Sequence, residues 1–122
     1  MKTATYDLIC NQGATFTRPF RFGTKDPVTG GFGSPHDLTG RTFIMQVREN
    51  YGDDDVLLEL STENGGIILE ATDGRISLQA SSTHTEGLPA LEAVYDVKMT
   101  NGSTVTRILQ GKFTVSPEVT RV

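Results

Sequence analysis

Cysteine is almost absent from this sequence, and its scarcity excludes one large class of small proteins. The chain has 122 residues and a single cysteine, Cys10, so no disulfide can form within it. Small secreted domains are commonly stabilised by several disulfides, whereas a reducing cytosol keeps thiols free. At this length we expect one domain, residues 1–122, synthesised in a cytosol and stabilised by its own hydrophobic core.

Long hydrophobic runs and clusters of basic residues are also missing. No apolar stretch approaches the roughly 20 residues that a membrane-spanning helix needs, and Met1–Asp7 lacks the apolar run of a signal peptide. The 15 Asp and Glu residues outnumber the 11 Lys and Arg residues, which gives a formal net charge of −4. Binding along a phosphate backbone requires clustered positive charge. We therefore expect a soluble protein, not exported by the usual route, that binds neither nucleic acid nor a membrane.

What the sequence does contain is a period of two. Apolar and polar residues alternate in most segments, which is typical of antiparallel strands with one face in a core. Turn dipeptides such as Asn64-Gly65, Asp73-Gly74 and Asn101-Gly102 separate several of these segments. The pattern predicts an all-β fold, a single antiparallel β-sandwich of about eight strands. The expected strands are Thr5–Cys10, Ala14–Phe22, Thr42–Arg48, Val56–Leu60, Ile67–Glu70, Arg75–Gln79, Ala93–Thr100, and Thr104–Leu109 continuing through Lys112–Ser116. Gly111 is expected to mark a bulge or bend that divides the last strand.

Two segments break the alternation. Gly23–Asp37 is rich in glycine and proline, which predicts a long loop insertion at 23–37. Ordering such a loop costs about 1–2 kcal/mol of backbone entropy per residue. We therefore expect it to be mobile in the free protein and ordered where a partner covers Phe32 and Val28. Ser82–Glu86, followed by a glycine, predicts one short helical turn that crosses between the sheets.

Residues arranged for catalysis are not evident. His36 and His84 lie in separate polar segments, and neither is at metal-ligand spacing from Cys10. No acidic residue lies in an apolar setting that would raise its pKa for acid–base catalysis. We expect no catalytic, cofactor-binding or metal-binding residue, no cofactor, and no enzymatic activity.

The run Asp53-Asp54-Asp55 allows two interpretations. A calcium loop requires alternating ligands, a central glycine and a distal glutamate, and this run has none of that spacing. A solvated, self-repelling loop between two strands is the interpretation that the spacing favours over a cation site.

Charged and apolar residues outside the expected core are candidates for contacts with a partner. Arg18 shares the alternation face of Phe16 and Phe20, so either its stem covers apolar surface at a sheet edge or it meets another subunit. The tail Glu118–Val122 is short and ionic, as expected of a docking segment. The candidate partner contacts are Arg18, Arg21, Val28, Phe32, Tyr51, Glu118 and Arg121.

Several short segments, taken in order, carry a resemblance to a known group. They are Tyr6–Leu8, Gln12–Phe16, Asp37–Gly40, Phe43–Arg48, Leu60–Ile67, Asp73–Leu78, Val94–Val97 and Leu109–Arg121. The chain is similar to small proteins encoded among bacteriophage virion genes, and resembles the immunoglobulin-like N-terminal domain of phage baseplate upper proteins. The resemblance implies an immunoglobulin-like sandwich, other virion proteins as partners, and a homo-oligomer or ring in the particle. It is weakest across residues 23–37, where this chain is longer.

The expected function follows from that resemblance and from the lack of catalytic residues. We expect a non-enzymatic bacteriophage structural protein, synthesised in the host cytoplasm and located in the virion. Its role would be an assembly or adaptor module of the tail, baseplate or head-tail junction. One alternative is a capsid decoration (cement) protein. A carbohydrate-binding sandwich is a weaker alternative, because the sequence has no tryptophan and only Phe32 and Tyr51 place aromatic rings in expected loops.

Overall fold

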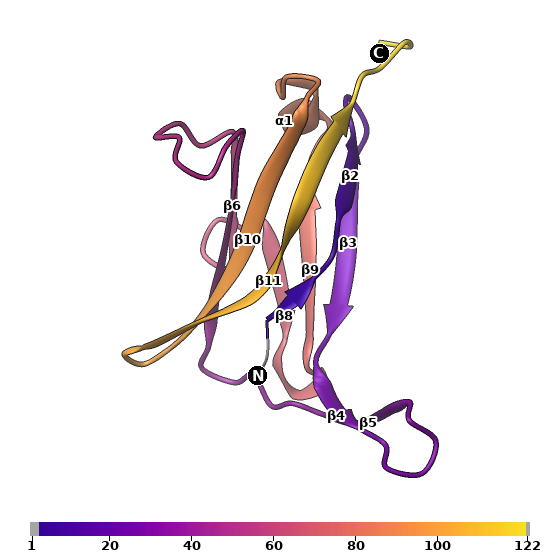
Figure 1. The fold of residues 1–122 in the computed structure, drawn as a ribbon, viewed down its shortest axis with the longest axis vertical. Helices are drawn as coiled ribbons and strands as arrows, with labels where there is room; N and C mark the ends of the chain where they lie inside the picture. Colours follow the sequence, from indigo (N-terminus) through magenta and orange to yellow (C-terminus); the bar gives the residue numbers. More distant parts are fainter. Residues whose placement is uncertain (1–2, 122) are drawn as a thin grey trace.

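The computed structural model describes residues 3–121, which form two facing sheets (Figure 1). One sheet has the strand order β1-β11-β10-β6-β7, with β2 also paired to β11, and the other has the order β3-β9-β8. A separate two-stranded ribbon consists of β4 and β5. The elements are β1 (Ala4–Thr5), β2 (Leu8–Asn11), β3 (Phe16–Arg21), β4 (Gly23–Lys25), β5 (Phe32–Pro35), β6 (Thr42–Arg48), β7 (Leu58–Ser61), β8 (Ile67–Glu70), η1 (Ala71–Asp73), β9 (Arg75–Ala80), α1 (Ser82–Glu86), β10 (Glu92–Asn101) and β11 (Thr104–Ser116). The expected all-β sandwich is confirmed.

One hydrophobic core joins the two sheets. Along β6, the side chains of Phe43, Met45 and Val47 are buried, whereas Ile44 between them is exposed, as the alternation predicts. The same period continues in β10, and in β11 from Leu109 to Val115. Cys10 is buried in this core, and burial raises the pKa of its thiol.

The first strand differs from its expected form. It is divided into β1 and β2, and both pair parallel to β11 and not antiparallel. Between them the Tyr6 N–H still donates to the Gln110 carbonyl at 2.9 Å, while the Asp7 carboxylate accepts from the Lys112 N–H at 3.0 Å. The Asp7 side chain therefore stands in for a backbone acceptor, and the ladder is interrupted there.

Gly111 has a different role from the one expected. β11 runs through it without a break, and the register shift against β10 falls between Val97 and Lys98, where Ile108 is the extra residue. Both Ile108 and Leu109 are buried as a result, which strict alternation would not allow. Gly111 is instead a point of close approach, because a Cβ there would lie 2.2 Å from the Tyr6 carbonyl oxygen.

The helical turn α1 is confirmed at Ser82–Glu86, and it connects β9 of one sheet to β10 of the other. Its N-cap is Ser81, whose hydroxyl accepts from the His84 N–H at 3.3 Å. The buried Thr85 hydroxyl donates to the Ala14 carbonyl at 2.7 Å and ties the turn to the β2–β3 connection. Neither helix in residues 3–121 has the length and apolar composition needed to cross a bilayer.

The segment 23–37 is not the unstructured loop that was expected, since it contains the β4–β5 hairpin. Backbone hydrogen bonds account for its order. The His36 N–H donates to the Phe22 carbonyl at 2.9 Å. The Gly30 N–H donates to the Asp26 carbonyl at 2.9 Å, and the Asp26 N–H donates to the Gly31 carbonyl at 2.8 Å. The Asp26 carboxylate also accepts from the Val28 N–H at 2.8 Å. Local hydrogen bonds thus supply the order that apolar side chains alone could not. Mobility of this segment in the free protein stays a prediction.

Stability at high pH should depend on Tyr95, whose hydroxyl donates to the Tyr6 carbonyl at 2.6 Å inside the core. Burial, with a further contribution from the Asp7 charge, raises the pKa of Tyr95 to about 12. An unfolded tyrosine loses its proton near pH 10. The unfolded state is therefore favoured progressively as pH rises from about 10 to about 12.

We expect the Tyr95→Phe variant to lack that part of the pH dependence. At neutral pH it should be about 1–2 kcal/mol less stable than the parent, because the Tyr6 carbonyl loses its donor. Urea unfolding at pH 7, 10 and 11.5 measures both effects. The exposed Tyr51→Phe is the matched control, and an identical pH profile for Tyr95→Phe and the parent would refute the assignment.

Candidate functional site

The candidate site lies at the end of the sandwich from which the β4–β5 hairpin projects, in the lower part of Figure 1. Three elements meet there: the end of β3, the short helix η1 with the glycine that follows it, and the hairpin itself. Two of the predicted contact residues, Arg21 and Phe32, are brought together at this end.

Arg21 links the hairpin to the sandwich. Its guanidinium lies 4.2 Å from the centroid of the Phe32 ring, which is a cation–π distance. The same guanidinium donates to the Asp73 carboxylate at 2.9 Å and to the Asp73 carbonyl at 3.1 Å. Phe32 is therefore covered by Arg21 of its own chain, although 43% of the residue stays exposed.

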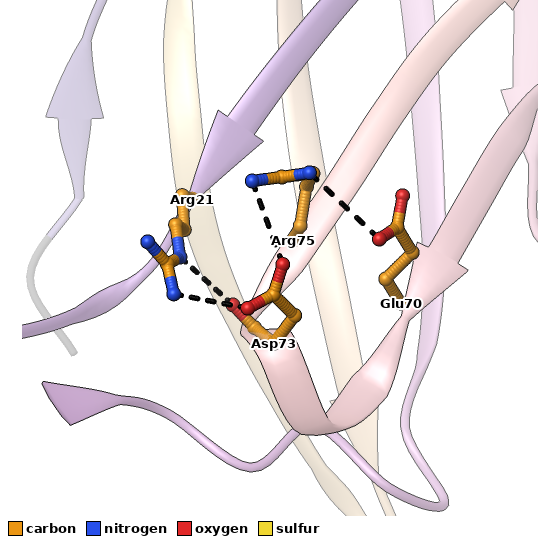
Figure 2. Close-up of polar contacts among 4 residues, drawn as sticks. All are labelled: Arg21, Glu70, Asp73 and Arg75. Carbon is orange, nitrogen blue, oxygen red and sulfur yellow. Dashed lines mark hydrogen bonds and ion pairs between the residues drawn. The ribbon is translucent and has the colours of Figure 1, made fainter.

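A second arginine extends the cluster, as Figure 2 shows. Arg75 lies 3.4 Å from the Asp73 carboxylate and 3.8 Å from that of Glu70, so Asp73 is shared by two guanidinium groups. Each of these side chains is about two-fifths to one-half exposed, and single exposed ion pairs stabilise a protein little. Their contribution here is to hold β3, η1 and β9 in one arrangement beside the hairpin.

Backbone packing at Gly74 completes the site. The Phe22 N–H donates to the Gly74 carbonyl at 2.7 Å, and the His36 N–H donates to the Phe22 carbonyl at 2.9 Å. Gly74 has a φ of +65°, and a Cβ there would lie 2.3 Å from the Phe22 oxygen and 2.9 Å from the His36 oxygen. Only glycine lets the η1–β9 turn approach both ends of the hairpin this closely.

The hairpin itself contributes nothing to the hydrophobic core. All four residues of β5 are exposed, and Val28 near the tip is 90% exposed. It is therefore an ordered, protruding ribbon with an apolar side chain near its end.

The other predicted contact residues lie elsewhere and do not converge on this end. Tyr51 is 88% exposed in the β6–β7 connection, where it lies beside Arg48 and Val94 of the larger sheet. Arg18 is exposed on the edge strand β3, with its guanidinium 5.3 Å from the Phe20 ring centroid. The head of Arg18 thus lies over an aromatic ring of its own strand, and a contact of Arg18 with another subunit stays a prediction.

The C-terminal tail is less free than expected. The Glu118 side chain is only 14% exposed and packs against Gly13, and the Glu118 N–H donates to the Gln12 side chain at 3.1 Å. Glu118 is thus held against the β2–β3 turn and is not an open contact residue. Arg121 is exposed, and Val122 lies outside the described residues.

The acidic loop after β6 is bound by the positively charged side chain of Arg48. Arg48 donates to the Asp53 carbonyl at 2.7 Å and to the Asp54 carbonyl at 2.9 Å, and the Asp53 carboxylate accepts from the Asn50 N–H. These bonds agree with a loop closed by internal contacts. Within residues 3–121 no three His, Cys, Asp or Glu side chains converge as metal ligands would.

One feature that the sequence did not indicate is a hollow of about 620 Å³ between β7, β9 and α1. Leu58, Leu60 and Ala80 line it, with His84 nearby. No Phe or Tyr side chain is among its lining residues, which include the smaller imidazole ring of His84. No motif could have revealed the hollow, because its lining residues come mainly from β7, the β7–β8 connection, β9 and α1, which are separate segments of the chain.

Removing the Arg21 guanidinium should loosen the hairpin while leaving the sandwich intact. The Arg21→Ala variant loses the ring contact with Phe32 and both bonds to Asp73. We expect faster amide exchange across β4 and β5, with a change in the free energy of unfolding below about 1 kcal/mol. Hydrogen–deuterium exchange measures the first and urea unfolding the second. Arg107→Ala, which removes an exposed ion pair with Asp96 on the other sheet, is the control. Unchanged exchange in the hairpin of Arg21→Ala would contradict the bracing role.

Comparison with known proteins finds similarity among solved structures. No protein-family model matches the sequence, and no curated protein matches it. Among solved structures, the chain is similar to the N-terminal domain of phage TP901-1 ORF48, with a TM-score of 0.49 and 10% sequence identity. The similarity covers 91% of this chain and 85% of that chain.

Proposed function

We propose that this protein is a non-enzymatic structural module of a bacteriophage particle, an adaptor in the tail, baseplate or head-tail junction that joins larger virion proteins. The observation that carries the proposal is the projecting β4–β5 hairpin with its exposed Val28. The sequence resemblance to the immunoglobulin-like domain of phage baseplate upper proteins supports the particle as its location.

The β4–β5 hairpin is an ordered ribbon that lies outside the core. A two-stranded hairpin is marginally stable alone in water. Here Arg21, Asp73 and Gly74 hold the hairpin against the sandwich, although no residue of β5 is buried in the core. Main-chain groups along an exposed ribbon can pair with a strand of another protein, with pockets for alternate side chains supplying specificity. A held, protruding ribbon therefore suits contact with a neighbouring protein.

The first test is the composition of the purified particle. Mass spectrometry of purified virions should detect the protein in a low, fixed copy number, as expected of one ring in a tail. A copy number that matches the capsid lattice would favour the decoration alternative. Absence from the virion would refute both.

The second test addresses the hairpin directly. The Val28→Asp variant should fold normally, because Val28 lies outside the core. Its incorporation into particles should fall at least about tenfold, which corresponds to a loss of about 1.4 kcal/mol of binding free energy. Val105→Asp is the matched control, because Val105 is an exposed valine, 59% accessible, near the tip of the β10–β11 hairpin. Normal incorporation of Val28→Asp, or a greater loss with the control, would exclude the β4–β5 hairpin as the contact.

A further inference from the structure

The free edges of the two sheets are not alike. An edge strand presents unpaired N–H and C=O groups to which another strand can add, and proteins usually block such edges with charges, proline or covering groups. The edges here are β3 and β8 in the smaller sheet, and β7 and the β1–β2 pair in the larger one.

The β7 edge is closed by a single side chain. The Asn64 side-chain oxygen accepts from the Ser61 N–H at 2.9 Å and from the Gly66 N–H at 2.8 Å. Its amide donates to the Glu59 carbonyl at 3.1 Å. Asn64 thus takes the place of the next strand, and Glu59 adds a charge to the same edge.

The edges of the smaller sheet carry charge or proline. β3 includes Pro19, which has no N–H to offer, and also Arg18 and Arg21. β8 ends at Glu70, which lies beside Arg75. Pairing of two copies through β3 would bring its arginines near one another.

β2 has none of these features. Its residues, Leu8–Asn11, are uncharged and contain no proline. The Tyr6 and Gln12 N–H groups both donate to β11, so backbone alternation turns the N–H and C=O of Ile9 toward the free edge. The Ile9 side chain is 68% exposed. A groove of about 370 Å³, lined in part by Ile9 and Arg18, runs between β2 and β3 beside this edge.

We propose that a second copy of this chain adds to the β2 edge, antiparallel, about a two-fold axis centred on Ile9. In that arrangement Ile9 of each copy exchanges two backbone hydrogen bonds with Ile9 of the other, and the two exposed side chains cover one another. A second copy fits because the edge is self-complementary: an uncharged strand can face itself without repulsion, whereas β3 carries two arginines and a proline and β7 is closed by Asn64. With Asn64 closing β7, the larger sheet can grow only on this side, so the association ends at a dimer. This inference does not depend on a role in a virion.

Sedimentation equilibrium of the purified chain tests the proposal. Because a four-residue edge is small, we expect a weak dimer that becomes prominent between about 10 μM and about 1 mM. The Ile9→Lys variant should be monomeric over the same range, since it sets two positive charges side by side. Ile68→Lys is the matched control, as Ile68 is an exposed isoleucine of the β8 edge, 43% accessible, and it should dimerise as the parent does. Circular dichroism melting confirms that both variants fold.

Amide exchange identifies the edge independently of the variants. The Ile9 amide should exchange at least about tenfold more slowly at high than at low protein concentration, with the amides of β8 unchanged. A parent that remains monomeric at about 1 mM would overturn the proposal, as would a dimer that persists in Ile9→Lys or is lost in Ile68→Lys.

Discussion

The Phe113→Ala variant is expected to lose about 3–5 kcal/mol of unfolding free energy. Phe113 is fully buried in β11. Its ring lies 5.6 Å from that of Phe16 in the opposite sheet and 6.5 Å from that of Tyr95 on the neighbouring strand, both edge to face. Truncation leaves a cavity between the two sheets and removes both ring contacts.

Urea unfolding measures this loss, and two variants calibrate it. Phe113→Leu keeps most of the volume and should cost less than half as much as the alanine variant. Phe32→Ala removes a ring that is 43% exposed and lies outside the core, and it should cost under about 1.5 kcal/mol. Equal losses for Phe113→Ala and Phe32→Ala would contradict a core centred on Phe113.

The Gly74→Ala variant is expected to be the most damaging of the glycine substitutions at turns. Its φ of +65° is unfavourable to any L side chain, at a cost of about 1–2 kcal/mol. The added Cβ would also lie 2.3 Å from the Phe22 carbonyl oxygen. That oxygen belongs to the backbone and cannot move aside without disrupting the hairpin attachment, which adds about 1–3 kcal/mol.

Gly102→Ala separates these two contributions. Gly102 has nearly the same φ, +62°, but a Cβ there would meet nothing within 4 Å. The unfolding free energy of Gly102→Ala should therefore fall only by the cost of the positive φ, about 1–2 kcal/mol. Gly74→Ala should lose clearly more in urea unfolding, and its β4–β5 amides should exchange faster. Similar stabilities of the two variants would show that the close approach of Phe22 has no energetic consequence.

The sandwich could be predicted because its strands are encoded locally. In Thr42–Arg48 the alternation of Phe43, Met45 and Val47 with polar or exposed residues is enough to define β6 with the bounds that the structure has. The turn dipeptides on either side likewise define Ile67–Glu70 as a strand, with the bounds of β8. The helical turn at Ser82–Glu86 was evident from its cap residues. Each of these features depends on neighbours within a few positions of the chain.

The candidate site could be predicted only in part. The sequence indicates Arg21 and Phe32 as candidate contacts, but it does not indicate that they pair with one another and with Asp73. Arg21 and Asp73 are 52 positions apart, and no periodicity links them. Glu118 was expected to be free, yet it packs against Gly13 through contacts that join opposite ends of the sequence.

The sequence by itself determined which side chains face the core, where the turns fall, and therefore that the chain forms an all-β sandwich. Only the tertiary structure decided how the strand edges are completed. The parallel addition of β1 and β2 to β11, the hairpin within 23–37, and the closure of β7 by Asn64 are all choices of backbone partner. Hydrogen-bonding groups of the backbone are the same in every residue, so a residue pattern can define the faces of a strand but not which strand lies at its edge.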